Sequence, residues 1–134
     1  MRRNIGLYRG KEMVGDAWCE GSLAYFGPQN TPRIGIIDHT GKKQWHEVDP
    51  ATVGECSGME DKHGEPIFEW DVLGHREIKG VVTYDPVKAA FMFRWRMFGN
   101  KADETFKACK LSDYGFLKSL EVIGNINDNP ELLQ

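Results

Sequence analysis

The sequence predicts a mainly β protein with little helix, and three observations support this. Short runs of β-favouring residues alternate with Gly, Pro, Asn and Asp along the whole chain. Glycine makes up 15 of the 134 residues, above the usual frequency of about 7%, and glycine suits tight turns. No window of about 12 residues sustains the i, i+3, i+4 apolar spacing of an amphipathic helix. The length fits one compact unit or two small subdomains that share a core.

Three runs in the first half predict an N-terminal β-meander subdomain over residues 1–52. The first, 17–26, is rich in aromatic residues and ends at a Gly-Pro pair. The second, 33–38, holds three isoleucines and is followed by turn residues at 39–42. The third, 44–48, alternates apolar and polar residues and stops at an Asp-Pro pair.

The second half, residues 53–134, opens with a predicted tight turn at 61–64, where Gly64 is free to take a positive φ. Residues 112–119 and the last few residues are each long enough for one helical turn only. Short strands with turn signals at this spacing predict a small SH3-like β-barrel. The expected strands are 67–73, 80–84, 89–98 (the longest), 104–110 and 120–126.

Composition and net charge narrow the classes of function that are expected. Apolar residues make up 40% of the chain and aromatic residues 11%, which is enough to bury a core. The formal net charge is −3. Proteins that grip a nucleic-acid backbone usually carry a basic excess, so the balance disfavours nucleic acid as the partner.

The three cysteines predict reduced thiols in a cytoplasmic protein. Cys19, Cys56 and Cys109 are far apart, odd in number and form no CxxC pair. No apolar run approaches the roughly 18 residues of a membrane span, and the start of the chain does not read as a signal peptide. We therefore expect no membrane association.

The segment 91–98, Phe-Met-Phe-Arg-Trp-Arg-Met-Phe, is the most unusual in the chain. Alternate side chains of a strand point to opposite faces, so positions 91, 93, 95 and 97 predict a core stripe. The other face carries Met92, Arg94, Arg96 and Phe98. Arginine forms bidentate pairs with phosphate and stacks on planar rings, so this face is a candidate site for a nucleotide-like ligand. A solvated outer face that contacts another subunit is the alternative.

A basic cluster near the N-terminus is a second candidate for phosphate contact, although charged termini are common. Its members are Arg2, Arg3, Arg9 and Lys11. Of these we place Arg9 and Lys11 with the candidate ligand-binding residues.

Acid–base and metal chemistry have little support. Glu69 and Asp71 alternate around Trp70, which would place two carboxylates on one strand face, where they could hold Mg²⁺ or move protons. No other residue supplies an evident nucleophile or third ligand, and no Walker loop, GxGxxG, GxSxG or HExxH motif occurs. We therefore assign no catalytic residue, no metal and no cofactor, and a non-enzymatic protein is expected.

The histidines do not predict a metal site. None of His39, His46, His63 and His75 forms a pair with the spacing of a zinc helix or knuckle. His39 and His46 flank a predicted hairpin and are the one pair that the fold could bring together. A solvated or hydrogen-bonded role for each is the simpler interpretation.

The chain resembles the YopX family of phage and prophage proteins. The likeness is carried by residues 8–11 with 18–23, by 48–72 and by 121–133, in the family's order and over most of the chain. The resemblance implies a cytoplasmic phage or prophage product with two β-rich parts that forms an oligomer. It implies no catalytic residue that could be transferred to this chain.

Two positions depart from the family pattern. The family usually has Asn where this chain has His63, and His tolerates a positive φ less well than Asn. The family usually has Gly where this chain has Trp70. A close approach to the backbone, which glycine would permit in the family, is therefore not expected to be shared at this position. Trp70 also places a large aromatic ring near the expected barrel entrance, and we include it among the candidate ligand contacts.

Three functions from different classes stay open. The first is a homo-oligomer that binds a small nucleotide-like ligand and sequesters a host immune signal, an anti-defence sponge. The second is a nucleic-acid-binding small barrel in phage replication or transcription, an analogy at the level of fold. The third is a metal-dependent phosphodiesterase that uses Glu69 and Asp71.

Overall fold

The computed structural model describes residues 6–28, 33–39, 42–99, 102, 104–115 and 117–134. Strands account for most of the regular structure, and the helical pieces in these residues are 3₁₀ turns of three or four residues. The mainly β fold predicted from the sequence is confirmed.

The chain packs as two compact units, and among the described residues one unit ends at Cys56 and the other begins at Ser57. The division falls inside one strand, β5 (Gly54–Glu60). The subdomain boundary between residues 52 and 53 stays a prediction.

The first unit is an antiparallel sheet in the order β4-β3-β2-β1, continued by the first residues of β5. Residues Ile36 and Val48 are buried in it, and Gly10 lets Val48 approach the backbone of β1 closely. The strands are β1 (Tyr8–Lys11), β2 (Trp18–Phe26), β3 (Arg33–Asp38) and β4 (Trp45–Glu47), with the 3₁₀ turn η1 (Pro50–Thr52) before β5.

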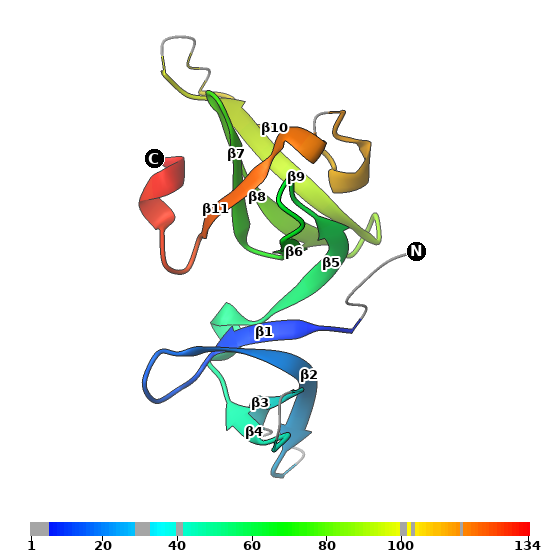
Figure 1. The fold of residues 1–134 in the computed structure, drawn as a ribbon, viewed down its shortest axis with the longest axis vertical. Helices are drawn as coiled ribbons and strands as arrows, with labels where there is room; N and C mark the ends of the chain where they lie inside the picture. Colours follow the sequence, from blue (N-terminus) through cyan, green and yellow to red (C-terminus); the bar gives the residue numbers. More distant parts are fainter. Residues whose placement is uncertain (1–5, 29–32, 40–41, 100–101, 103, 116) are drawn as a thin grey trace. The chain divides into compact units, whose positions relative to one another are not determined.

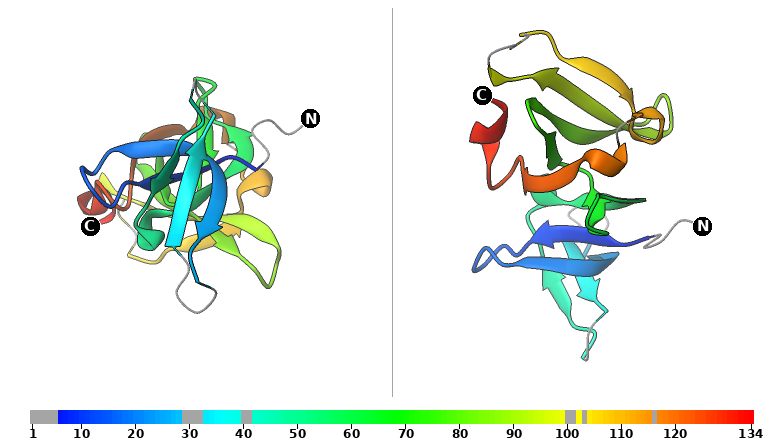
Figure 2. Two further views of the ribbon diagram at one scale, coloured as in Figure 1. Left: turned by 90° about the horizontal axis from the view of Figure 1, so that it is seen from below. Right: turned by 45° about the horizontal axis from the view of Figure 1, so that its top comes forward.

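The second unit is built on a five-stranded antiparallel sheet in the order β10-β9-β8-β7-β11. The long hairpin of β8 and β9 lies at its centre, and the C-terminal turn η5 follows β11 (Figure 1, Figure 2). The elements are β6 (Pro66–Phe68), β7 (Asp71–His75), β8 (Ile78–Asp85), β9 (Ala90–Met97), β10 (Lys107–Lys110), β11 (Glu121–Asn125), and the 3₁₀ turns η3 (Leu111–Asp113), η4 (Leu117–Ser119) and η5 (Pro130–Leu133).

The main core cluster of this unit lies on one face of the sheet, and Val72, Val81 and Met92 are buried on the other face. Phe93 of β9 is fully buried and contacts the ring of Tyr114 edge-on, with ring centroids 5.0 Å apart. Trp95 packs against the same tyrosine at 5.6 Å. The predicted core stripe of β9 is therefore present at Phe91, Phe93 and Trp95, whereas Met97 is half-buried outside this cluster. The other buried members of the cluster are Ile67, Leu73, Val82, Leu111 and Leu120.

The turn at 61–64 forms as predicted. Gly64 has φ +79°, and its backbone N–H donates to the carbonyl of Asp61 at 3.0 Å. His63 is not among the described residues with a positive φ, so replacing the family's Asn by His carries no backbone strain here.

Closure into an SH3-like barrel is not confirmed. Within the described part of the chain, β10 and β11 stand at opposite edges of the five-stranded sheet, which stays open. Two strands had not been expected from local pattern, β1 and β5. The longest strand is β2, with nine residues against eight in β9.

Candidate ligand-binding face

The face of β9 opposite the core presents Arg94 and Arg96. Strand register adds two residues to them. Lys79 of β8 stands directly opposite Arg96. Phe106 precedes Lys107, the partner of Trp95, so the antiparallel register places Phe106 opposite Arg96 on the other side. Directly opposed residues share a sheet face, so cations and rings from three neighbouring segments meet here.

These side chains form a chain of cation–π contacts, which we call the cation–aromatic ladder. The Arg96 guanidinium carbon lies 3.7 Å from the ring centroid of Phe98 and 5.5 Å from that of Phe106. Lys79 Nζ lies 5.1 Å from the Phe98 centroid. The Arg94 guanidinium carbon lies 5.6 Å from the Phe106 centroid. The order along the ladder is therefore Lys79, Phe98, Arg96, Phe106 and Arg94.

A backbone hydrogen bond fixes the position of Phe98 in the ladder. Phe98 follows the end of β9, and its N–H donates to the carbonyl of Glu77 at 2.7 Å, in the turn between β7 and β8. This bond ties the aromatic ring to the end of the hairpin that carries Lys79. The ring is thereby held between cations that come from two different strands.

The ladder gathers positive charge that the protein leaves incompletely neutralised. In the described part of the chain, neither Lys79 nor Arg94 has an ion-pair or hydrogen-bond partner, and their recorded contacts are with the rings. Cation–π contacts contribute about 0.5–1 kcal/mol each at exposed sites, and they leave the charge available to an anion. The arrangement can therefore bind a ligand with several negative groups.

Sequence reasoning identified Arg94, Arg96 and Phe98, and the structure brings these three together. It missed Lys79 and Phe106, which join them only through the pairing of β8 and β10 with β9. If the predicted turns at 85–89 and 99–104 are taken as two hairpin turns, the pairing of the flanking strands places both residues opposite Arg96.

Trp70 lies away from the ladder. It sits in the turn before β7, whereas Lys79 pairs with Gly74 near the other end of that strand. The Trp70 N–H donates to Val82 O at 2.7 Å, and its carbonyl accepts from Ile126 N at 2.9 Å. Its φ is +76°, a left-handed conformation that glycine adopts without strain, so the glycine usual in the family suits this position.

Arg9 and Lys11 belong to the first unit and share one aromatic partner. The Arg9 guanidinium carbon and Lys11 Nζ lie 5.1 Å and 5.7 Å from the ring centroid of Trp18. A ligand-binding role for them stays a prediction. Arg2 and Arg3 of the same basic cluster lie outside the described residues.

The expectation that Glu69 and Asp71 share a strand face is wrong. Glu69 and Trp70 form a turn, and the positive φ at Trp70 breaks the alternation. Asp71 is 1% exposed, and its carboxylate accepts a hydrogen bond from the Phe68 N–H at 2.8 Å, so it supports the turn. Among the described residues, no three side chains of the metal-binding types are grouped to hold an ion.

His39 and His46 have separate partners. His39 Nε2 lies 2.7 Å from Ser22 Oγ. His46 lies between two carboxylates, with Nε2 2.7 Å from Asp38 Oδ2 and Nδ1 3.3 Å from Glu12 Oε1. The two carboxylates face opposite ring nitrogens, so they cannot join one nitrogen of His46 around a single metal ion.

The cysteines are free thiols. Burial, together with the nearby carboxylates of Glu12 and Asp38, raises the pKa of Cys19 to about 11. Burial and Asp113 also raise the pKa of Cys109. Thiols with raised pKa values are poor nucleophiles at neutral pH.

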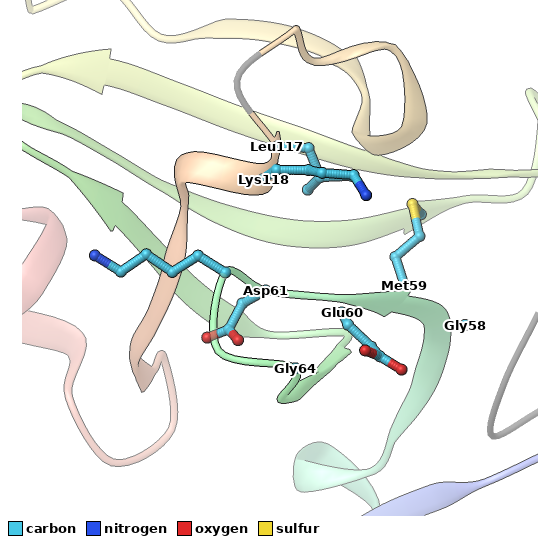
Figure 3. Close-up of a pocket in the computed structure, with 8 residues that line it drawn as sticks. Gly58, Met59, Glu60, Asp61, Gly64, Leu117 and Lys118 are labelled. Atoms are coloured by element: carbon cyan, nitrogen blue, oxygen red, sulfur yellow. The ribbon is translucent and has the colours of Figure 1, made fainter.

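A groove of about 640 Å³ lies between the end of β5 and η4. Figure 3 shows Met59 and Glu60 on one side of it and Leu117 and Lys118 on the other. The groove mixes both signs of charge on a partly apolar floor, whereas the ladder collects one sign. The ladder is therefore the stronger candidate for a defined ligand class.

Comparison with known proteins gives one family match. A family model described as YopX protein matches residues 7–134. A search of curated proteins found no match. None of the helices that the structure describes has the length and apolar content to cross a bilayer.

Proposed function

The chain belongs to the YopX family, and from this and the ladder we propose that it is a non-enzymatic binding protein for a small, nucleotide-like anion. The observation that carries the proposal is the row of three cations held by two phenylalanine rings on the outer face of β8 and β9. Arginine pairs with phosphate through two parallel hydrogen bonds, which gives both affinity and orientation.

Preorganisation supports binding as the function. Lysine and arginine lose considerable side-chain entropy when a ligand fixes them. Here the rings and the Glu77 bond to Phe98 already restrict Arg96 before any ligand arrives. Less ordering is then needed on binding, and tight capture requires no catalytic group.

We also propose that this binding sequesters a nucleotide signal of the host. In the cytoplasm of a phage-infected or lysogenic host, a protein that captures a nucleotide signal without cleaving it would act as a sponge and blunt the immune response. We include a homo-oligomer in this proposal. The exposed rings of Tyr25 and Phe26, 58% and 51% accessible, supply apolar surface of the kind that subunits bury.

Titration calorimetry with a panel of cyclic nucleotides and ADP-ribose derivatives tests the binding function. At least one ligand should bind, and Arg94→Gln and Arg96→Gln should each weaken it about tenfold or more, since each removes a charge-assisted contact. Lys88→Gln is the matched control. It removes one positive charge from the turn at the opposite end of the β8–β9 hairpin.

Absence of heat with every ligand in the panel would contradict the binding function. Equal affinity of the arginine variants and the Lys88 control would move the site away from the ladder. The mass of the particle by light scattering tests the oligomer separately, and a monomer at micromolar concentration would remove that part of the proposal.

A further inference from the structure

We infer that one face of the first sheet carries the surface through which one copy of this chain binds a second copy. The surface consists of Phe26 of β2, Arg33 of β3, and Trp45 and Glu47 of β4, and we call it the aromatic patch. The inference rests on the homo-oligomer of the proposed function and names the surface that holds it together. It does not involve the ladder.

Strand register places the four residues of the aromatic patch on the same face of the sheet. Phe26 stands directly opposite Arg33, and Glu47 stands opposite Gly35, two residues further along β3. Trp45 is two residues from Glu47 on β4, and residues two apart in a strand share a face. The fully buried isoleucine of β3 follows Gly35 directly and so points to the other face. The patch therefore lies on the face opposite the core of this unit.

The sheet holds the rings of the patch in fixed positions. The indole of Trp45 lies over Gly35 so closely that a Cβ at Gly35 would overlap the ring. Phe26 contacts this indole edge-on, with ring centroids 5.0 Å apart, and the Arg33 guanidinium carbon lies 5.4 Å from the indole centroid. Phe26 is nevertheless 51% exposed. An exposed aromatic surface that is already ordered loses little entropy when a partner covers it.

The charge of the patch suits a second copy of the same surface. Arg33 donates from Nε and Nη2 to the two carboxylate oxygens of Glu47, at 2.9 and 2.8 Å, so the two charges cancel. In a contact with twofold symmetry a patch meets its own copy, and any net charge on it would repel. Aromatic residues and arginine are also the types enriched at the centre of protein interfaces. A nucleic-acid partner would instead require a basic excess.

The edge of the sheet beside the patch is not open to strand pairing along its length. Strand β4 stands at this edge and has three residues. On its outer side the Met13 N–H donates to the Glu47 carbonyl at 3.0 Å, and Glu12 forms an antiparallel bridge with Val48. Pairing of β4 with a strand of another subunit would have to displace this segment. The face that carries the patch is therefore the more accessible surface for a second copy.

The test is the mass of the particle in solution, measured by light scattering and sedimentation for wild type and four variants. Wild type should be at least a dimer at micromolar concentration. Phe26→Glu, Arg33→Glu and Glu47→Arg should each raise the dissociation constant about tenfold or more, because each places like charges or a buried charge in the contact. Val87→Glu is the control, since Val87 is 92% exposed in the β8–β9 turn, and it should keep the wild-type mass.

Mixing two variants separates a second copy from an unrelated partner. The patch of Arg33→Glu carries two negative charges and that of Glu47→Arg carries two positive charges. Each variant should repel its own copy and attract the other, so an equimolar mixture should recover the wild-type mass. The double variant Arg33→Glu/Glu47→Arg restores the neutral pair and should also assemble. Failure of the mixture and of the double variant to assemble would overturn the inference.

The remaining outcomes also decide the inference. Far-UV circular dichroism confirms that each variant is folded, and exposed ion pairs contribute little to stability. If Tyr25→Glu dissociates the particle and Phe26→Glu does not, the contact lies on the opposite face and the inference fails while the homo-oligomer stands. A monomeric wild type overturns both. Neither result changes the ligand-binding function, which calorimetry measures separately.

Discussion

The carboxylate of Asp61 accepts a hydrogen bond from the backbone N–H of Val122, with 2.9 Å between Oδ2 and the nitrogen, across 61 residues of sequence. Its other oxygen accepts from the N–H groups of His63 and Glu65 at 2.8 and 2.9 Å. Asp61 is 7% exposed. One buried side chain therefore both shapes the turn before β6 and ties it to β11.

Replacing Asp61 by Asn should destabilise the protein by about 2 kcal/mol, because an amide presents one acceptor oxygen and leaves a buried N–H without its partner. Urea unfolding followed by tryptophan fluorescence measures this change. Glu131→Gln, at an exposed acidic position, is the control and should change stability by less than about 0.5 kcal/mol. Equal midpoints for the two variants would contradict the role of Asp61.

The same carboxylate should make stability depend on pH. Burial acts to raise its pKa, but the N–H donors of Val122, Glu65 and His63, with the nearby His63 side chain, outweigh burial and lower the pKa below its usual range. A carboxyl with a lowered native pKa contributes stability that is present above its unfolded pKa, about 3.9. That stability is lost as the pH falls through the native value.

Wild type should therefore exceed Asp61→Asn in unfolding free energy by a constant amount above about pH 5, and by progressively less below about pH 4. Urea titrations from pH 7 to pH 3 follow this difference. A gap that widens on acidification would show that Asp61 is not held in its ionised form by the fold.

The local sequence pattern predicted the strands that are rich in β-favouring residues. It missed strands whose formation depends on pairing with neighbouring strands. The run Arg33–Asp38 was predicted at its observed limits. Strand β5 contains Gly54, Ser57 and Gly58, which are weak strand formers, and it was missed because its pairing with β1 and β6 supplies the order.

The candidate site was predictable to the same extent. Arg94, Arg96 and Phe98 follow from alternation within one strand. Lys79 and Phe106 require the register of neighbouring strands. The error at Glu69 and Asp71 has a different origin, since a tryptophan gives no local signal that its backbone is left-handed.

Trp70 offers a direct measurement of that backbone strain. Trp70→Ala and Trp70→Gly both remove the indole, but only glycine relieves the cost of φ +76°. The glycine variant should therefore be more stable than the alanine variant by about 1 kcal/mol, since a left-handed conformation costs other residues about 1–2 kcal/mol. Thermal or urea unfolding of the pair measures the difference. An alanine variant of equal or greater stability would mean that the turn relaxes to a negative φ.

Gly80 of β8 should tolerate no larger residue. A Cβ there would overlap the carbonyl of Arg94 and lie 2.7 Å from Trp95 Cβ, and neither the backbone nor a Cβ can swing away. Gly80→Ala should therefore push β8 from β9 and cost about 3 kcal/mol or more. Lys79 immediately precedes Gly80, so the same displacement should weaken the contact of Lys79 with Phe98 in the ladder.

Gly115→Ala is the matched control, because a Cβ at Gly115 meets nothing within 4 Å. Its urea midpoint should stay near that of wild type, while that of Gly80→Ala falls sharply. If Gly80→Ala keeps its midpoint but loses affinity for a ligand found in the calorimetry panel, the core tolerates the strand shift and only the ladder is affected. If both properties survive, the close approach of β8 to β9 at Gly80 is not required for either.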